Sequence, residues 1–192
     1  MELRDLLISK VRVKLLEVFL VDPEEMYHVR ELVRRTGEEI NAVRRELSHM
    51  EKCGMVRKEP RGNRLYYWFR KDYLFYNELL TLVAKSTGIG SEILKNRAKI
   101  GRLSYVVFSQ KFVQRIPRGD DPVDVLVVGD VILPEMAALI KAEEGKREQE
   151  IFYTVFNDAE FTLRKQKRDP FIVGIMGSPK VLIIGNELDL VS

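Results

Sequence analysis

Three aspartates stand together near the middle of the chain, in the stretch RGDDPVDVLVVGD at residues 118–130. Asp120, Asp121 and Asp124 precede the apolar run at residues 125–128, which predicts a buried β-strand. Carboxylates at the edge of a strand can hold a metal ion. The same residues also favour tight turns, because Asp side chains hydrogen-bond to nearby backbone groups. The stretch is therefore a catalytic site, the remains of one, or a turn.

A second group of side chains could bind an anion. The spacing predicts a helix over residues 38–52 whose apolar face carries Ile40, Val43, Leu47 and Met50. A helix turns by about 100° per residue, so the opposite face is fixed by this stripe. Arg can pair with guanine, Asn with adenine and Lys with phosphate, which makes this face a candidate DNA-binding surface. It carries Asn41, Ala42, Arg45, His49 and Lys52, with Arg44 on its flank.

A basic hairpin follows this helix. The runs MVRKE and RLYYWFR predict two strands, and Gly62-Asn63 between them is typical of a tight turn with positive backbone dihedrals. Residues 55–71 contain six Lys or Arg residues against one acid, Glu59. The four aromatic residues at 66–69 could stack on bases, but alternate positions of such a strand are expected to pack on the helices. The candidate DNA contacts of the hairpin are Arg57, Lys58, Arg61, Asn63 and Arg64.

The charge of the chain is unevenly distributed. Residues 1–100 hold 20 Lys and Arg against 15 Asp and Glu, whereas residues 101–192 hold 12 against 14. A net positive first half favours nucleic acid as the partner. No apolar run is long enough to span a membrane and no signal-peptide pattern opens the chain, so we expect a cytoplasmic protein without a membrane partner.

Cysteine and histidine give no sign of a metal centre. The single cysteine, Cys53, excludes an internal disulfide and a cysteine-rich zinc site, and we expect it to be a small buried hydrophobe. His28 and His49 lie in different elements and have no cysteine partner at ligand spacing. Neither a structural metal nor a cofactor is expected.

The first half of the chain reads as three helices and a hairpin. A first helix carries Leu3, Leu7 and further apolar residues at spacings of three and four, and VRELVRRTG predicts a short second helix. After the hairpin, a helix over residues 73–85 is followed by STGIGS, which we interpret as a linker at the domain boundary. Its apolar residues exceed what one small domain can cover, so we expect a dimer contact there, with packing on the second domain as the alternative. They are Leu74, Leu79, Leu80, Leu82 and Val83.

The second half alternates between strand and helix patterns. Four strand-like runs, YVVF, VDVLVVG, IFYTVF and KVLIIG, are separated by helices, one of them opening at Pro134. Asn157 and Glu160 have the spacing of a capping box, and DPFIVGIM predicts a further short helix. This alternation predicts a small α/β domain with its own sheet.

The first half resembles the ArsR-like branch of the winged helix-turn-helix family over about residues 1–72. The stretch NAVRRELSHMEKCGMVRKEPRGNRLYYWF matches the recognition helix of that family, its hydrophobic-Gly-hydrophobic exit and its Tyr-rich second wing strand. The resemblance implies binding to double-stranded DNA, usually as a dimer. It places the helix at 38–52 in the major groove and the wing on the backbone or the minor groove.

The second half resembles the minimal nucleotidyltransferase domain of the DNA polymerase beta superfamily over about residues 91–186. The stretches VDVLVVGD and DAEFTLRKQKRDPFIVGIMGSPKVLIIG carry this resemblance. Active members have a Gly-Ser turn, an Asp-x-Asp pair and a third acid, which together hold magnesium ions and nucleotide phosphates. Here Ser109-Gln110, Pro122-Val123-Asp124 and Tyr153-Thr154 stand at those places, and Glu150 lies only at the entry of the third strand. Asp121 and Asp124 are thus vestigial candidates.

The sequence therefore predicts an α+β and α/β protein of two domains. We expect a winged helix-turn-helix at residues 1–72, a helix and linker at 73–90, and a nucleotidyltransferase-like domain with a mixed sheet at 91–192. The expected function is that of a dimeric, DNA-binding transcriptional regulator whose second domain is catalytically degenerate and serves interaction, dimerisation or the sensing of a nucleotide or other small molecule. An active metal-dependent nucleotidyltransferase is the alternative, and a partner-binding scaffold is a third.

Overall fold

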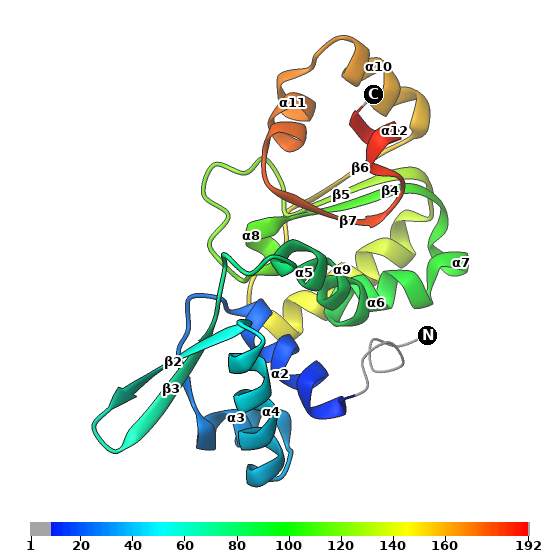
Figure 1. Ribbon diagram of the computed structural model, residues 1–192. Helices are drawn as coiled ribbons and strands as arrows, with labels where there is room; N and C mark the ends of the chain where they lie inside the picture. Colours follow the sequence, from blue (N-terminus) through cyan, green and yellow to red (C-terminus); the bar gives the residue numbers. More distant parts are fainter. Residues whose placement is uncertain (1–8, 192) are drawn as a thin grey trace. The chain divides into compact units, whose positions relative to one another are not determined.

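The computed structural model describes residues 9–191, so Leu3 and Leu7 of the expected first helix lie outside it. The chain divides into two compact units, Met1–Val83 and Ala84–Ser192. Each unit contains helices and one β-sheet (Figure 1), so the fold is of the mixed α and β class. Among the described residues, no helix is long and apolar enough to cross a membrane.

The described part of the first unit contains three helices, three short strands and most of a fourth helix, α5 (Tyr76–Ser86). Gly37 ends the second helix with a left-handed φ of 65°, and the next helix begins behind Glu39. Gly62 and Asn63 join the two longer strands, and only Gly62 of this pair has a positive φ, as a type II′ turn requires at its first central residue. The elements are α2 (Lys10–Val21), β1 (Tyr27–His28), α3 (Val29–Thr36), α4 (Ile40–Lys52), β2 (Val56–Arg61) and β3 (Arg64–Phe69).

The three strands form an antiparallel sheet in the order β1-β3-β2. The sequence did not predict β1, because two residues are too few to show a periodic pattern. The register pairs Val56 with Phe69 and Lys58 with Tyr67, and places Arg57 opposite Trp68. Since side chains alternate along a strand, the first two pairs lie on one face and the third pair lies on the other. We call these the α4 face and the outer face, because Lys58 reaches Glu51 of α4.

The core of the first unit lies between the helices and the α4 face of this sheet. Helix α4 contributes the stripe that its periodicity predicts, although Ile40 at its start is only half-buried. Tyr27 of β1 packs edge to face on Phe19 of α2, with ring centroids 5.7 Å apart. The buried side chains include Leu15, Leu16, Phe19, Leu20, Tyr27, Leu32, Val43, Leu47, Met50, Val56, Tyr67 and Phe69.

The second unit is a three-layer arrangement around a four-stranded sheet. The strand order is β6-β5-β4-β7, in which β5 and β6 are parallel and the other pairs are antiparallel. Helices α10, α11 and α12 cover one face of the sheet, and α6 (Gly88–Lys95), α7 (Arg97–Ile100) and α9 cover the other (Figure 1). The elements are β4 (Gly101–Ser109), α8 (Gln110–Val113), β5 (Val125–Val131), α9 (Leu133–Arg147), β6 (Tyr153–Phe156), α10 (Asp158–Gln166), α11 (Pro170–Gly177), β7 (Lys180–Ile184) and α12 (Glu187–Val191).

Two helix-start signals in this unit are found in the structure, one of them in part. The Asn157 side chain accepts a hydrogen bond from the Glu160 backbone N at 2.8 Å and so caps α10, whereas the Glu160 carboxylate accepts from Arg164 at 3.0 Å rather than completing a capping box. Pro170 stands at the first turn of α11, behind the cap of Asp169. The face of the sheet under α10–α12 is a continuous apolar cluster of Val107, Leu126, Val128, Phe156, Phe161, Ile172, Ile175 and Leu190.

The expected linker at STGIGS is largely helical. Helix α5 (Tyr76–Ser86) and helix α6 (Gly88–Lys95) are separated only by Thr87, and the division between the units falls inside α5, within the range 73–90. A Cβ atom at Gly90 would lie 1.9 Å from the backbone oxygen of Ala84. This glycine therefore permits a close approach of backbone to backbone, which sequence pattern alone does not distinguish from flexibility.

Candidate nucleic-acid interface and acidic site

The outward face of α4 carries cations that have no carboxylate partner among the described residues. Of the six residues predicted to face DNA or to flank that face, Ala42 is half-buried and the other five are exposed, namely Asn41, Arg44, Arg45, His49 and Lys52. Ion pairs engage most other cations of this unit, such as Lys14 with Glu38 at 2.6 Å. Within the described part of the chain, no carboxylate lies within ion-pair distance of Arg44, Arg45 or Lys52.

The helix terminus beside these cations is already occupied by an acid. The Glu39 carboxylate accepts hydrogen bonds from the backbone N atoms of Asn41 and Ala42, at 2.8 and 2.9 Å. These bonds, together with Arg45 and Arg44, lower the pKa of Glu39 below its ordinary value. An ionised carboxylate at this position disfavours a phosphate at the start of α4, so the middle and the end of the helix are the parts suited to DNA.

The α4 face of the wing continues this cationic surface. Lys58 donates to Glu51 of α4 at 2.8 Å. Both Lys58 and Arg44 lie close enough to Tyr67 to lower the pKa of its hydroxyl, although burial outweighs them and raises that pKa overall.

The tip of the wing brings two like charges together. Arg61 and Arg64 are directly opposed in the register of β2 and β3, on either side of the Gly62-Asn63 turn. The Arg61 guanidinium lies 3.3 Å from the Glu59 carboxylate and 5.6 Å from the centre of the Tyr66 ring. Arg64 is exposed and no carboxylate among the described residues pairs with it. Opposed like charges destabilise a strand pair unless an anion lies between them.

Arg57 lies on the outer face, as Arg61 and Arg64 do, and it is 4.0 Å from Asp72. One sequence-based expectation for this unit is wrong. Cys53 is exposed rather than buried, because α4 ends at Lys52 and Cys53 follows it as the C-cap residue. Its Sγ lies 3.5 Å from His49 Nε2.

The aromatic run of β3 alternates as predicted. Tyr67 and Phe69 are buried on the α4 face, whereas Tyr66 and Trp68 are half-buried on the outer face. Two of the four aromatic residues are thus core residues, and Tyr66 packs edge to face on the His28 ring at 5.7 Å. Trp68 remains partly accessible.

In the second unit, the acidic stretch lies at the ends of β4, β5 and β7. Asp121 is 8 % exposed, and its Oδ1 lies 3.1 Å from the Nζ of Lys111. Lys111 also donates to the backbone oxygen of Arg118 at 3.0 Å. An ammonium group therefore neutralises Asp121. Asp120, in contrast, is exposed in the turn.

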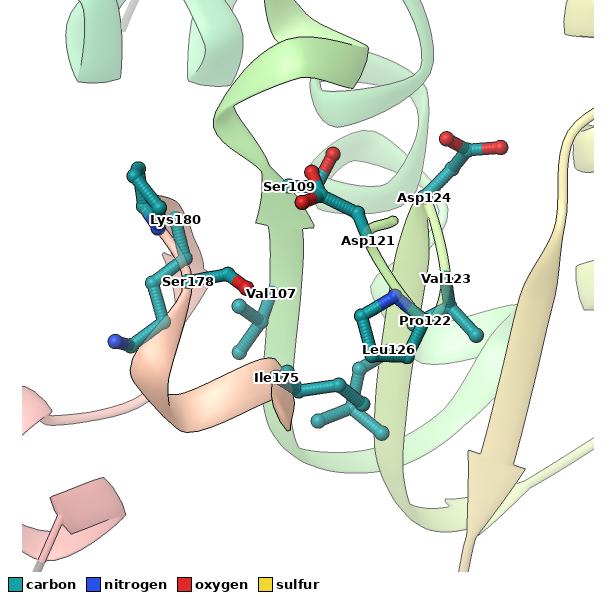
Figure 2. Close-up of a pocket in the computed structure, with 11 residues that line it drawn as sticks. Val107, Ser109, Asp121, Pro122, Val123, Asp124, Leu126, Ile175, Ser178 and Lys180 are labelled. Carbon is teal, nitrogen blue, oxygen red and sulfur yellow. The ribbon is translucent and has the colours of Figure 1, made fainter. Parts of the chain in front are cut away.

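The Asp124 carboxylate is hydrogen-bonded to a backbone N–H group. Its Oδ2 accepts a hydrogen bond from the Phe152 backbone N at 2.9 Å, and its own backbone N donates to the Phe152 oxygen at 2.8 Å. Burial raises the pKa of Asp124 above its ordinary value, against the opposing effects of this hydrogen bond and of Arg118 and Arg147. Figure 2 shows that the carboxylates of Asp121 and Asp124 point in different directions.

The turn that would cradle a phosphate is also occupied. The backbone N of Ser109 donates to the Asp124 oxygen at 2.9 Å, and that of Gln110 donates to the Pro179 oxygen at 3.0 Å. The Ser109 hydroxyl caps α8 by accepting from the Phe112 backbone N at 3.1 Å. These amides have partners within the unit, so they are not available to a ligand.

The pocket between these elements is small. Its walls include Asp121, Asp124, Ser109, Pro122 and Lys180, as Figure 2 shows, and its volume is about 10 Å³. That is roughly the space of one water molecule. A nucleotide does not fit into it without a rearrangement.

No family model, curated protein or solved structure that was compared with this chain matches it.

The chemistry available at the acidic site follows from this geometry. Phosphoryl transfer with two metal ions needs several carboxylates that converge on ions about 3.5–4 Å apart. Within residues 9–191, no group of three or more His, Cys, Asp or Glu side chains is arranged to hold a metal ion. At the place of the third acid, Tyr153 is 37 % exposed at the edge of the sheet. Sequence reasoning missed the feature that defines this site, the Lys111–Asp121 ion pair, because ten residues separate the partners.

Proposed function

We propose that this protein is a cytoplasmic, DNA-binding transcriptional regulator of the winged helix-turn-helix type. In this proposal α4 enters the major groove of duplex DNA, and the β2–β3 wing contacts the sugar-phosphate backbone. Its second unit is a nucleotidyltransferase-like domain that does not transfer nucleotides and serves interaction, dimerisation or sensing.

The observation that carries the proposal is the set of unpaired cations on α4. An exposed Arg or Lys commonly pairs with a nearby acid, as Arg35 does with Glu31 at 3.1 Å. Arg44, Arg45 and Lys52 lack such partners in the described chain and share one helix face with Asn41. A surface of this kind gains electrostatic energy from a polyanion and carries the groups that can pair with bases.

The wing tip supports the same partner. The opposed Arg61 and Arg64 repel each other at the exposed tip of the hairpin, and among the described residues only Arg61 has a carboxylate partner, Glu59. A bound phosphate would remove this repulsion, which is how backbone contacts position a protein on a duplex. Lys58, on the α4 face, lies between this tip and the recognition helix.

A second copy of the chain is proposed as a further partner. Of the five apolar residues expected at a dimer contact, Leu80 and Val83 are buried and Leu79 and Leu82 are half-buried, so these four offer little surface to a partner. Leu74, in contrast, is 79 % exposed, and Phe75 beside it is 52 % exposed, immediately before α5. Adjacent large apolar side chains at the surface favour burial against another protein surface. A dimer through this segment would present two recognition helices to a symmetric DNA site.

Salt titration of DNA affinity tests the proposal. Each phosphate contact contributes about 0.9 to the slope of log affinity against log salt concentration. We expect Arg44→Gln with Arg45→Gln to weaken binding to duplex DNA and to reduce this slope by up to about 2 per protomer. The matched control removes two other exposed, ion-paired cations, Lys10→Gln with Lys95→Gln, and should leave the slope nearly unchanged. Equal slopes for the two double variants would refute the assignment of α4.

Incubation with radiolabelled nucleoside triphosphates tests the alternative enzymatic function. We expect no label on the protein, on DNA or on candidate partners with either magnesium or manganese, because Asp121 is held by Lys111 and the two carboxylates diverge. Label that disappears in the variant Asp124→Ala would contradict this expectation and establish an active site.

A further inference from the structure

A hollow on the outer face of the wing is not used by the proposed DNA contacts of α4. It lies between the loop at residues 23–26 and the paired strands β2 and β3, and its volume is about 510 Å³. Pockets for small organic ligands span about 300–1,000 Å³. The hollow is lined by Pro23, Glu24, Met26, Arg57, Glu59, Trp68, Phe69, Arg70, Lys71 and Asp72.

The apolar part of this hollow centres on Trp68. The residue is half-buried, so part of its indole ring remains accessible. Pro23 and Met26 of the loop add apolar side chains to the lining of the same hollow. An accessible indole in a partly apolar hollow is suited to a planar ring, because aromatic rings gain energy from offset stacking in addition to burial.

The ion pairs in the lining of the hollow leave one cation without a close carboxylate partner of its own. Glu24 pairs with Lys71, and Glu59 pairs with Arg61 at 3.3 Å. Asp72 receives two hydrogen bonds from Arg70, at 2.7 and 3.0 Å. The remaining cation of the hollow is Arg57, which is directly opposite Trp68 in the strand register.

Arg57 is only weakly paired and can engage another anion. Its closest carboxylate, that of Asp72, is 4.0 Å away and already holds the Arg70 guanidinium. The Arg57 side chain is 59 % exposed. A guanidinium pairs well with an incoming carboxylate, since it can donate two parallel hydrogen bonds.

We propose that this hollow binds a small planar aromatic carboxylate, with its ring against Trp68 and its carboxylate on Arg57. A bicyclic ring is within the size of the hollow. Each acid in the lining has a cationic partner, so an aromatic amine would find no unpaired carboxylate. The site is separate from the small acidic pocket of the second unit, and its existence does not depend on DNA binding.

The single tryptophan makes the proposal directly measurable. The chain has one Trp, so a ¹H–¹⁵N spectrum of the full-length protein contains one indole N–H signal. Titration would use three probes of one shape: 2-naphthoate, the neutral 2-naphthamide and the cationic 2-(aminomethyl)naphthalene. We expect naphthoate to shift the Trp68 signal to saturation and to bind about tenfold more tightly than the other two, since a charge-assisted hydrogen bond contributes about 1.5–3 kcal/mol.

Variants of exposed arginines locate the carboxylate. Arg57→Gln should weaken naphthoate binding by about tenfold, and Arg57→Lys should restore part of the affinity. The control Arg34→Gln, on a side chain of α3 that is 79 % exposed, should leave the affinity unchanged. Three results would each overturn the proposal: equal affinity for the three probes, undiminished affinity in Arg57→Gln, or a Trp68 signal that moves only in proportion to added probe.

Discussion

Removal of the Lys111 ammonium should destabilise the second unit more than removal of the Asp121 carboxylate. Lys111→Met leaves a carboxylate that is only 8 % exposed without a cation, and breaking a buried pair in this way costs about 3–5 kcal/mol. The Lys111 side chain is 39 % exposed, so water reaches the pair and we expect about 2–3 kcal/mol, at or below the lower end of that range. Asp121→Asn should cost about 1 kcal/mol, because Lys111 retains water and the Arg118 oxygen as partners.

Hydrogen exchange of the β5 amides measures this difference within the second unit. The amides at residues 125–128 lie in a central strand and report the free energy of unfolding of the sheet. In the double variant Lys111→Met with Asp121→Asn, the cost should fall below the sum of the single variants by at least about 1 kcal/mol. Lys95→Met, at an exposed ion-paired lysine, is the control and should cost less than about 0.5 kcal/mol. The reasoning would be refuted if the two single variants lost the same free energy of unfolding and if the loss in the double variant equalled their sum.

Three further substitutions test the stability of the two units and the proposed DNA contacts. Burial raises the pKa of Asp124, so the ionised carboxylate destabilises the folded state at neutral pH. Asp124→Asn can still accept the hydrogen bond from the Phe152 backbone N and should raise the free energy of unfolding at neutral pH. Urea unfolding at several pH values should show this gain shrinking as the pH falls through the raised pKa, and a constant gain would contradict it. The fully buried Tyr27 hydroxyl has no hydrogen-bond partner among the described residues. Tyr27→Phe should therefore leave the free energy of unfolding unchanged or raise it by about 1 kcal/mol. A clear loss of stability in urea unfolding would contradict this expectation. Arg61→Ala with Arg64→Ala should reduce the salt slope of DNA binding by about 1–2 per protomer, and an unchanged slope would remove the wing from the interface.

Much of the secondary structure could be predicted because its causes are local. The stripe of Val43, Leu47 and Met50 fixes α4, and the run at residues 125–128 forms part of β5. The Gly62-Asn63 turn sets the hairpin. In each case the signal is a spacing of apolar residues or a turn residue within a few positions, and it requires no knowledge of distant partners.

The features that sequence did not reveal depend on contacts between distant residues. The two-residue strand β1 exists because Tyr27 pairs with Tyr67 forty positions away. The Ser109 backbone N donates a hydrogen bond to the backbone oxygen of Asp124. The close backbone approach that requires glycine at position 90 is to Ala84, near the end of α5. Such pairings arise from tertiary packing, which local patterns do not encode. The same reason explains why the carboxylates near the acidic site could be noticed from sequence, whereas their neutralisation by Lys111 could not.

Selection of duplexes from a random DNA pool by the full-length protein tests the central claim most directly. DNA reading by α4 predicts enrichment of one shared motif with two-fold symmetry, since a dimer presents two copies of the helix. It also predicts that Arg45→Ala relaxes one position in each half-site and costs about 1–3 kcal/mol on the preferred site. Failure of the protein to enrich any motif at low salt, or the same motif with the same sharpness from Arg45→Ala, would contradict the account.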